Sequence, residues 1–130
     1  MAADVNPSLP RRGPAPPVAD MTNAELAELV ETRDPYQGRA LFELADRVPG
    51  DDDAATRVGT LSRLASVRET RLFDRVSLAW SAIISLLAAE TAHSRETAYA
   101  AFGALDAAER QDMLDYLECE RIEDAHPKVD

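Results

Sequence analysis

Cysteine and aromatic residues are scarce in this 130-residue chain. The single cysteine, Cys119, cannot form a disulfide within the chain, and the sequence around it holds no zinc-ligand cluster. We therefore expect a reducing, cytoplasmic location and a fold held together by its hydrophobic core. Aromatic residues make up 5% of the chain, so aliphatic side chains must fill that core.

Positive charge is also in short supply. The chain has 24 Asp and Glu residues against 14 Lys and Arg, which gives a formal net charge of −10 at pH 7. Duplex nucleic acid and anionic membranes both select clustered positive charge, so this balance argues against either as the main ligand. A partner protein with a basic surface is compatible with it.

Long hydrophobic runs are missing as well. The longest uncharged stretch runs from Val76 to Ala89, whereas a helix that spans a bilayer needs about 20 residues. Three serines interrupt this stretch, but apolar side chains such as Trp80, Ile84 and Leu87 recur on most sides of a helix. The stretch therefore predicts a helix buried at the centre of the domain.

Sequence motifs of catalysis and cofactor binding are lacking. The five glycines are dispersed, which excludes a glycine-rich phosphate loop, and neither a nucleophile elbow nor a paired-histidine helix occurs. Both histidines, His93 and His126, are interpreted as surface residues. The carboxylates near Cys119 should raise its thiol pKa, which opposes a nucleophilic role. We expect no enzymatic activity, no catalytic residue, no metal site and no cofactor.

Proline is concentrated at the N-terminal end of the chain. Residues 1–20 hold five of the eight prolines and almost no large apolar side chain. Such a segment cannot bury enough surface to fold alone, so the sequence predicts a disordered tail over 1–20. An alternative is a polyproline segment at 14–17 that docks on a partner. A single helical domain over 21–122 and a polar tail over 123–130 should follow.

Helix-capping patterns predict an all-α fold after the tail. Side chains that can cap a helix start occur at Thr22 with Glu25, at Asp34 before Pro35, at 51–53, at Ser94, and at Asp106 with Glu109. With the uncharged run, these signals predict about six helices in three antiparallel pairs. The second helix should end near residue 48 and the third helix near residue 68. No stretch alternates strictly between polar and apolar residues as a half-buried strand does.

The predicted fifth helix carries a recognisable pattern. It reads R-x-x-A-x-x-A-F-G-x-L, formed by Arg95, Ala98, Ala101, Phe102, Gly103 and Leu105. This pattern resembles the helix signature of HEAT-type repeats, and the apolar residues 83–87 are similar to the helix that precedes it in those repeats. The resemblance covers residues 83–105 and implies a non-catalytic scaffold with Arg95 projecting outward. A compact helical bundle is the alternative architecture.

Negative charge accumulates at the C-terminal end. Residues 104–130 hold nine acids against three basic residues, a net charge of −6. In the last predicted helix, Asp112, Asp115 and Glu118 recur every three residues on one face. This face is either solvated surface or a patch for a basic partner. If the site lies elsewhere, we expect it in a groove flanked by Arg63, Arg71 and Arg95.

The sequence therefore predicts a non-catalytic interaction module, such as an adaptor or an assembly chaperone. The alternative is an inhibitor of the immunity or antitoxin kind, whose acidic face blocks the basic cleft of a nuclease or another nucleic-acid-binding protein. In both cases we expect the partner to be another protein with a basic surface, and neither nucleic acid nor a membrane. Arginine outnumbers lysine thirteen to one and alanine is abundant, which indicates a GC-rich bacterial genome.

Overall fold

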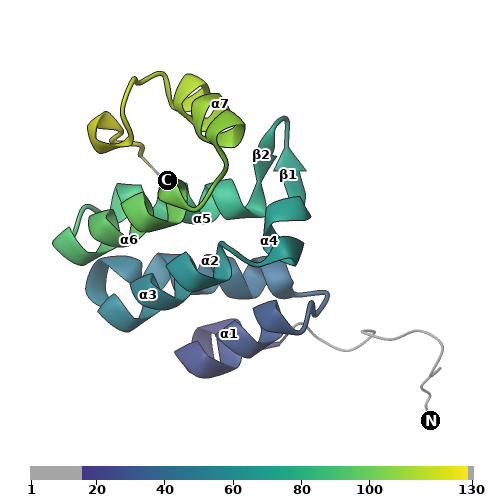
Figure 1. Cartoon of the computed structure of the whole chain (residues 1–130). Coiled ribbons are helices and arrows are strands. Elements are labelled where there is room, and N and C mark those ends of the chain that lie inside the picture. Colours follow the sequence, from purple (N-terminus) through teal and green to yellow (C-terminus); the bar gives the residue numbers. More distant parts are fainter. Residues whose placement is uncertain (1–15, 129–130) are drawn as a thin grey trace, which may run out of the picture.

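The structure is a computed structural model that describes residues 16–128. Within this range it is all-α, with seven α-helices and one two-stranded antiparallel sheet, which confirms the predicted fold class (Figure 1). The helices are α1 Asn23–Glu31, α2 Gln37–Arg47, α3 Asp52–Leu61, α4 Ala65–Glu69, α5 Leu78–Ala89, α6 Ala92–Gly103 and α7 Ala107–Leu117. The strands are β1 Arg71–Phe73 and β2 Val76–Ser77, and the 3-10 helices are η1 Val18–Asp20, η2 Val48–Gly50 and η3 Ile122–Asp124.

Three predicted helix starts are confirmed. The Thr22 hydroxyl and the Glu25 carboxylate form a complete capping box at α1. At α3, the Asp51 carboxylate accepts a hydrogen bond from the third backbone N–H that follows it. Asp106 caps α7 in the same way, through the backbone N–H of Glu109 at 2.8 Å. Each cap satisfies a donor that the first helical turn leaves unpaired.

Two other helix starts are placed wrongly by the sequence. The Asp34 carboxylate accepts from the Tyr36 backbone N–H at 2.9 Å and forms a turn, so α2 begins only at Gln37. Ser94 does not cap α6 from outside. It occupies the third helical position, where its hydroxyl exchanges hydrogen bonds with the N-cap residue Thr91.

The predicted third helix is broken, which makes seven helices rather than six. It ends at Leu61 because the Ser62 hydroxyl donates to the Gly59 carbonyl at 2.7 Å and the backbone then becomes extended at Leu64. The short helix α4 begins directly afterwards. The second predicted helix ends as expected, since α2 gives way to the 3-10 turn η2 at Val48.

A short hairpin was not expected from the sequence. Its strands β1 and β2 precede α5, with Arg71 opposite Ser77 and Phe73 opposite Val76. Asp74 adopts a left-handed conformation in the turn, with φ of 49°. The Leu78 backbone N–H donates to the Thr70 carbonyl at 2.7 Å, and this bond closes the base of the hairpin. The first two residues of the uncharged run are therefore strand, and the helix begins after them.

Helix α5 lies at the centre of the domain, as predicted. It packs against α2, α3, α4 and α6, and its buried residues include Trp80, Ile83 and Leu87. Ile84 was expected to lie beside Trp80 in the core, but it is only partly buried and packs at the core's edge. Ile83 takes the fully buried position instead.

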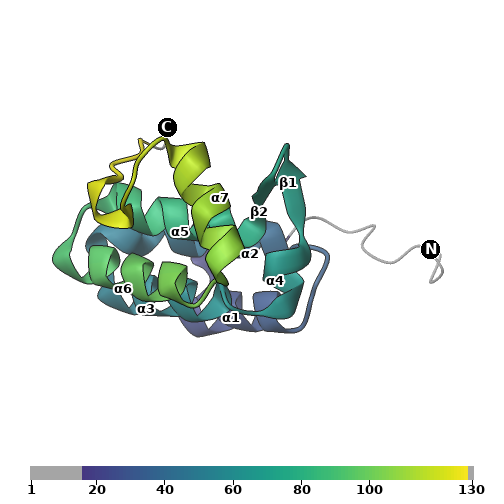
Figure 2. The same ribbon diagram turned by 45° about the horizontal axis from the view of Figure 1, so that its top comes forward.

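The helices form successive layers. Figure 1 shows α1 on one side, α2 and α3 next to it, then α5 and α6, and finally α7 with the hairpin. In the turned view of Figure 2, α7 again lies over the layer of α5 and α6, and the hairpin stands beside it. The hairpin and α7 therefore rise from the same face of α5, and they form the walls of the site described below.

The ends of the described chain are attached to the domain. Of the predicted tail at 1–20, residues 1–15 lie outside the described residues, and η1 follows. The Arg47 guanidinium donates to the backbone carbonyls of Val18 and Ala19. At the other end, Arg95 donates to the carbonyls of Glu123 and Ala125, within the segment predicted as a polar tail.

Candidate functional site

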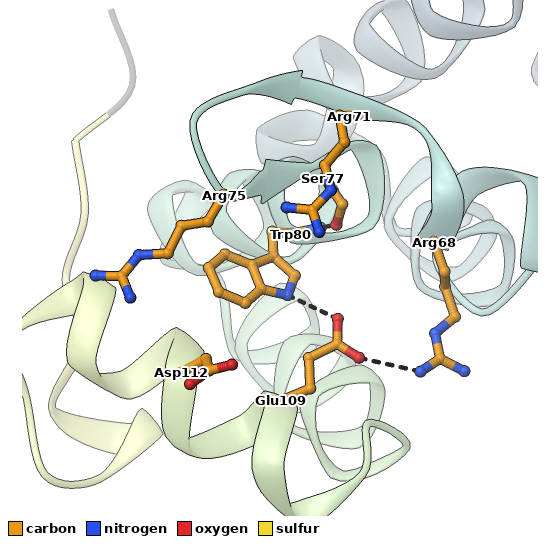
Figure 3. A pocket seen from close by; sticks show the side chains of 7 residues that line it. All are labelled: Arg68, Arg71, Arg75, Ser77, Trp80, Glu109 and Asp112. Carbon is orange, nitrogen blue, oxygen red and sulfur yellow. Dashed lines mark hydrogen bonds and ion pairs between the residues drawn. The ribbon is translucent and has the colours of Figure 1, made fainter.

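The hairpin, α4, α5 and α7 enclose a hollow of about 350 Å³ (Figure 3). Positive side chains come from α4 and the hairpin, negative ones from α7, and the Trp80 indole of α5 lies in the middle. The lining residues are Arg68, Arg71, Arg75, Ser77, Trp80, Glu109 and Asp112. We call this site the arginine hollow.

One carboxylate fixes the floor of the arginine hollow. Glu109 accepts the indole N–H of Trp80 at 2.9 Å and a guanidinium N–H of Arg68 at 3.1 Å. The sequence predicts a capping box between Glu109 and Asp106, but only half of it forms, because the Glu109 carboxylate is turned toward Trp80. Glu109 thereby ties α7 to both α4 and α5.

The two arginines of the hairpin carry uncompensated charge. Arg71 and Arg75 are exposed, and neither forms an ion pair with a carboxylate of residues 16–128. The guanidinium carbon of Arg75 lies 5.8 Å from the centroid of the Tyr116 ring, a cation–π contact. The Tyr116 ring in turn lies 5.9 Å from that of Trp80. Aromatic contacts thus position Arg75 at the rim while leaving its N–H groups available.

Ser77 adds a hydroxyl donor to the wall of the hollow. Its oxygen accepts the Trp80 backbone N–H at 3.1 Å and so caps α5. This bond uses a lone pair and leaves the hydroxyl proton to be donated. Ser77 is the N-cap residue of α5, so the N-terminal end of this helix, which carries partial positive charge, lies beside the hydroxyl.

Apolar side chains are exposed at the tip of the hairpin. Phe73 is 61% exposed and its neighbour Leu72 is 37% exposed, and both lie between Arg71 and Arg75 in the sequence. The remaining large apolar side chain that is exposed within residues 16–128 is Phe42 of α2, at 43%. The hairpin is therefore the place in the described chain where two such side chains are adjacent.

The predicted acidic face is exposed, and one of its members lines the hollow. Asp112 faces the same hollow as Arg71, although the sequence assigns these two residues to alternative sites. Asp115 accepts a hydrogen bond from the Gln111 side chain at 3.0 Å, and Glu118 follows directly after α7 in a left-handed conformation. All three acids are exposed.

The predicted arginine groove is not assembled. Arg71 lines the arginine hollow, but Arg63 lines a separate hollow of about 270 Å³ between α3 and α6. Arg95 was expected to project outward, yet its side chain is only 11% exposed. Its guanidinium donates to the carbonyls of Leu87, Glu123 and Ala125, so it holds the C-terminal segment against α6.

Sequence reasoning missed Arg68, Arg75, Ser77, Trp80 and Glu109 as members of one site. The sequence does contain a signal for Arg68 and Arg75, because these two residues and Arg71 follow one another closely just before the uncharged run. Glu109 and Asp112 gave no such signal, since α7 is brought to the hairpin only by the tertiary fold.

A threonine and a histidine are in contact in the second hollow. The Thr56 hydroxyl lies 2.7 Å from Nε2 of His93, and it also donates to the Asp52 carbonyl at 3.1 Å. While its proton is directed to that carbonyl, the hydroxyl can only accept from His93, which requires the tautomer protonated at Nε2. An activated nucleophile requires the opposite direction, with the hydroxyl donating to the imidazole.

Glu90, which contacts the C-terminal segment, and Cys119 have shifted pKa values. The hydrogen bond from His126, at 2.7 Å, is the main cause that lowers the pKa of Glu90, and Arg95 adds to it. The pKa of the half-buried Cys119 thiol is raised, as the sequence predicts. The main cause is burial, followed by the charge of Asp124, rather than the neighbouring carboxylates in the sequence.

No protein family, curated protein or solved structure matches this chain. The resemblance of residues 83–105 to HEAT-type repeats stays a prediction. In the described range of 16–128, no three His, Cys, Asp or Glu side chains are grouped so that they could hold a metal ion. Nor does that range contain a helix with the length and apolar character needed to cross a membrane.

Proposed function

We propose that the protein is a non-catalytic interaction module, an adaptor or assembly chaperone, that binds a partner protein through its hairpin. The observation that carries this proposal is the exposure of Phe73 beside Leu72 at the hairpin tip. Covering a phenylalanine side chain contributes about 1.5–3 kcal/mol, and the isolated domain leaves most of this unused. Interfaces concentrate their binding energy in aromatic and arginine side chains, and both occur here.

The hairpin is held in place before any partner binds. Val76 and Ser77 of β2 are buried, and the bond between Leu78 and Thr70 closes the hairpin base. A segment that is ordered beforehand loses little conformational entropy on binding. The exposed tip therefore offers its apolar surface on a rigid support.

The charge of the protein favours a partner with a basic surface. Asp112, Asp115 and Glu118 are exposed on and just after α7, the helix that stands beside the hairpin. Together with the net charge of −10, they would accelerate the approach of a basic partner and orient it toward this face. The free thiol of Cys119 supports a reducing, cytoplasmic location for the pair.

The resemblance of residues 83–105 to HEAT-type repeats supports the same class of function. Helices α5 and α6 pack against each other, and the small residues Ala98 and Ala101 are buried in α6. Small residues at such positions permit close approach of neighbouring helices, as a helical scaffold requires. In such a scaffold one helical face is offered to the partner.

A second candidate is an inhibitor of the immunity or antitoxin kind. The exposed series Asp112, Asp115 and Glu118 favours it, because successive carboxylates resemble the phosphates that a nuclease cleft binds. In this case the partner is a nuclease or another nucleic-acid-binding protein, and the acidic face occupies its basic cleft.

Photo-crosslinking in cells of the source organism tests the proposal. A photoreactive phenylalanine analogue replaces Phe73 in one variant and Phe42 in a matched control, because both side chains are exposed. We expect a discrete covalent adduct with one protein from position 73 and none from position 42. The absence of an adduct at position 73, or the same adducts at both positions, would overturn the proposal. Identification of a nuclease in the adduct selects the second candidate.

A further inference from the structure

We propose that the arginine hollow binds one carboxylate of the partner protein, from an Asp or Glu side chain, between Arg71 and Arg75. The Ser77 hydroxyl supplies a third donor. This inference rests on the proposed function, because the carboxylate belongs to the protein that covers the hairpin. It adds to that function a specific charged contact beside the apolar one.

The positive charge available to a ligand comes from the hairpin. Arg68 is already paired with Glu109 at 3.1 Å, whereas Arg71 and Arg75 have no carboxylate partner within residues 16–128. A guanidinium presents several N–H donors in a planar fork, and this geometry matches the two oxygens of a carboxylate. Figure 3 shows the Arg75 guanidinium directed away from Arg71, so the two groups hold a carboxylate from both sides once Arg75 turns toward the hollow.

The floor of the hollow strengthens such a contact. Trp80 is buried below the rim, and its indole N–H is bonded to Glu109, so Trp80 offers a ligand an apolar ring face and no free donor. Hydrogen bonds to a charged group are stronger where nearby apolar surface excludes water. The Ser77 hydroxyl and the N-terminal end of α5 add partial positive charge from below.

The charge count of the lining indicates a monovalent anion. Three arginines and two acids line the hollow, which leaves a net charge of +1. One carboxylate neutralises this charge, whereas a phosphate dianion would add a second negative charge close to Asp112. The net charge of −10 of the whole chain also repels polyanions such as nucleic acid. A single carboxylate on a partner that is otherwise basic satisfies both conditions.

The single tryptophan of the chain allows a direct test, because Trp80 lies in the hollow. The full-length protein is titrated with N-acetyl-aspartate methylamide, whose only charge is the side-chain carboxylate, while Trp80 emission and the indole N–H resonance are recorded. The asparagine analogue is the neutral control, and inorganic phosphate is a separate titration. We expect saturable binding of the aspartate probe at about millimolar concentration and no saturation by the asparagine probe.

Matched variants assign the binding to the hairpin arginines. R71Q and R75Q should each weaken binding of the aspartate probe by about tenfold or more, the effect of one charge-assisted hydrogen bond. R63Q, in the separate hollow, should leave it unchanged. These arginines are exposed, and far-ultraviolet circular dichroism verifies that each variant is folded.

Three results would overturn the inference: no saturable binding of the aspartate probe, an equal effect of R63Q, or tighter binding of phosphate than of the carboxylate. The titration and the crosslinking experiment fail independently. An adduct at position 73 without probe binding rejects the carboxylate contact alone. If the probe binds but no adduct forms, the proposal that a partner protein binds the hairpin is rejected. The assignment of the carboxylate to that partner is then rejected as well.

Discussion

Replacing Glu109 by alanine tests whether this one carboxylate joins α7 to the rest of the domain. The substitution leaves the buried indole N–H of Trp80 without its acceptor, which costs about 1–3 kcal/mol. The ion pair with Arg68 is partly exposed to solvent and adds about 0–1 kcal/mol. Water can enter the hollow and replace part of the lost acceptor, so we expect the free energy of unfolding to fall by about 1–2 kcal/mol.

Two matched variants separate the contributions of Glu109. E109Q retains a side-chain oxygen that can accept the indole N–H, and it should lower the free energy of unfolding by less than about 1 kcal/mol. R68Q removes only the ion pair and should cost less than about 1 kcal/mol. The cap of α7 is preserved in all three variants, because Asp106 accepts the backbone N–H of residue 109.

Urea titration measures these differences through two signals. Trp80 emission reports on the hollow, and circular dichroism at 222 nm reports on the helices as a whole. The reasoning is refuted if E109A lowers the free energy of unfolding by less than about 0.5 kcal/mol, or if E109Q is as costly as E109A. Either outcome would mean that the indole hydrogen bond does not stabilise the position of α7.

Three further outcomes are expected. Ile83→Ala should lower the free energy of unfolding by about 2–5 kcal/mol in urea, because this side chain is fully buried; a loss below about 0.5 kcal/mol would contradict a central α5. Asp51 and Asp53, at the start of α3, have pKa values below their ordinary 3.8, mainly because the Asn23 side chain donates hydrogen bonds to them. The free energy of unfolding should therefore decrease as the pH falls below 3.8. Asn23→Ala should make this acid-induced loss, followed by urea titration between pH 2 and 7, shallower, and an unchanged profile would refute the assignment. Reversing Asp112 and Asp115 to lysine should slow association with the crosslinked partner steeply at low salt and little at high salt, measured by stopped flow; equal rates at low salt would show that the face is only solvated surface.

Helix starts with a side-chain cap could be predicted because their signals are local. Thr22, Asp51 and Asp106 each bond to a backbone N–H three residues away, and this spacing is visible in the sequence. The central position of α5 was also predictable, because fourteen residues without charge have to be buried somewhere. The break after α3 could not be predicted, because it depends on a hydrogen bond from the Ser62 hydroxyl to the Gly59 carbonyl rather than to water.

The site was harder to predict because its members come from distant parts of the chain. Arg71 and Asp112 were each singled out, but nothing in the sequence indicates that α7 returns to the hairpin. The hairpin has strands of only three and two residues, too short to show an alternating pattern. Glu109 matched a capping box, and its second function as the acceptor of the Trp80 indole became visible only in three dimensions.

The contact of Phe73 with a partner protein is the central claim, and it is tested most directly by one affinity measurement. The partner identified by crosslinking is titrated calorimetrically with the wild-type protein, with F73S and with the matched control F42S. We expect F73S to weaken binding by about tenfold or more, because about 1.5–3 kcal/mol of apolar burial is lost, while F42S leaves the affinity unchanged. Equal affinities of wild-type protein and F73S would contradict the claim.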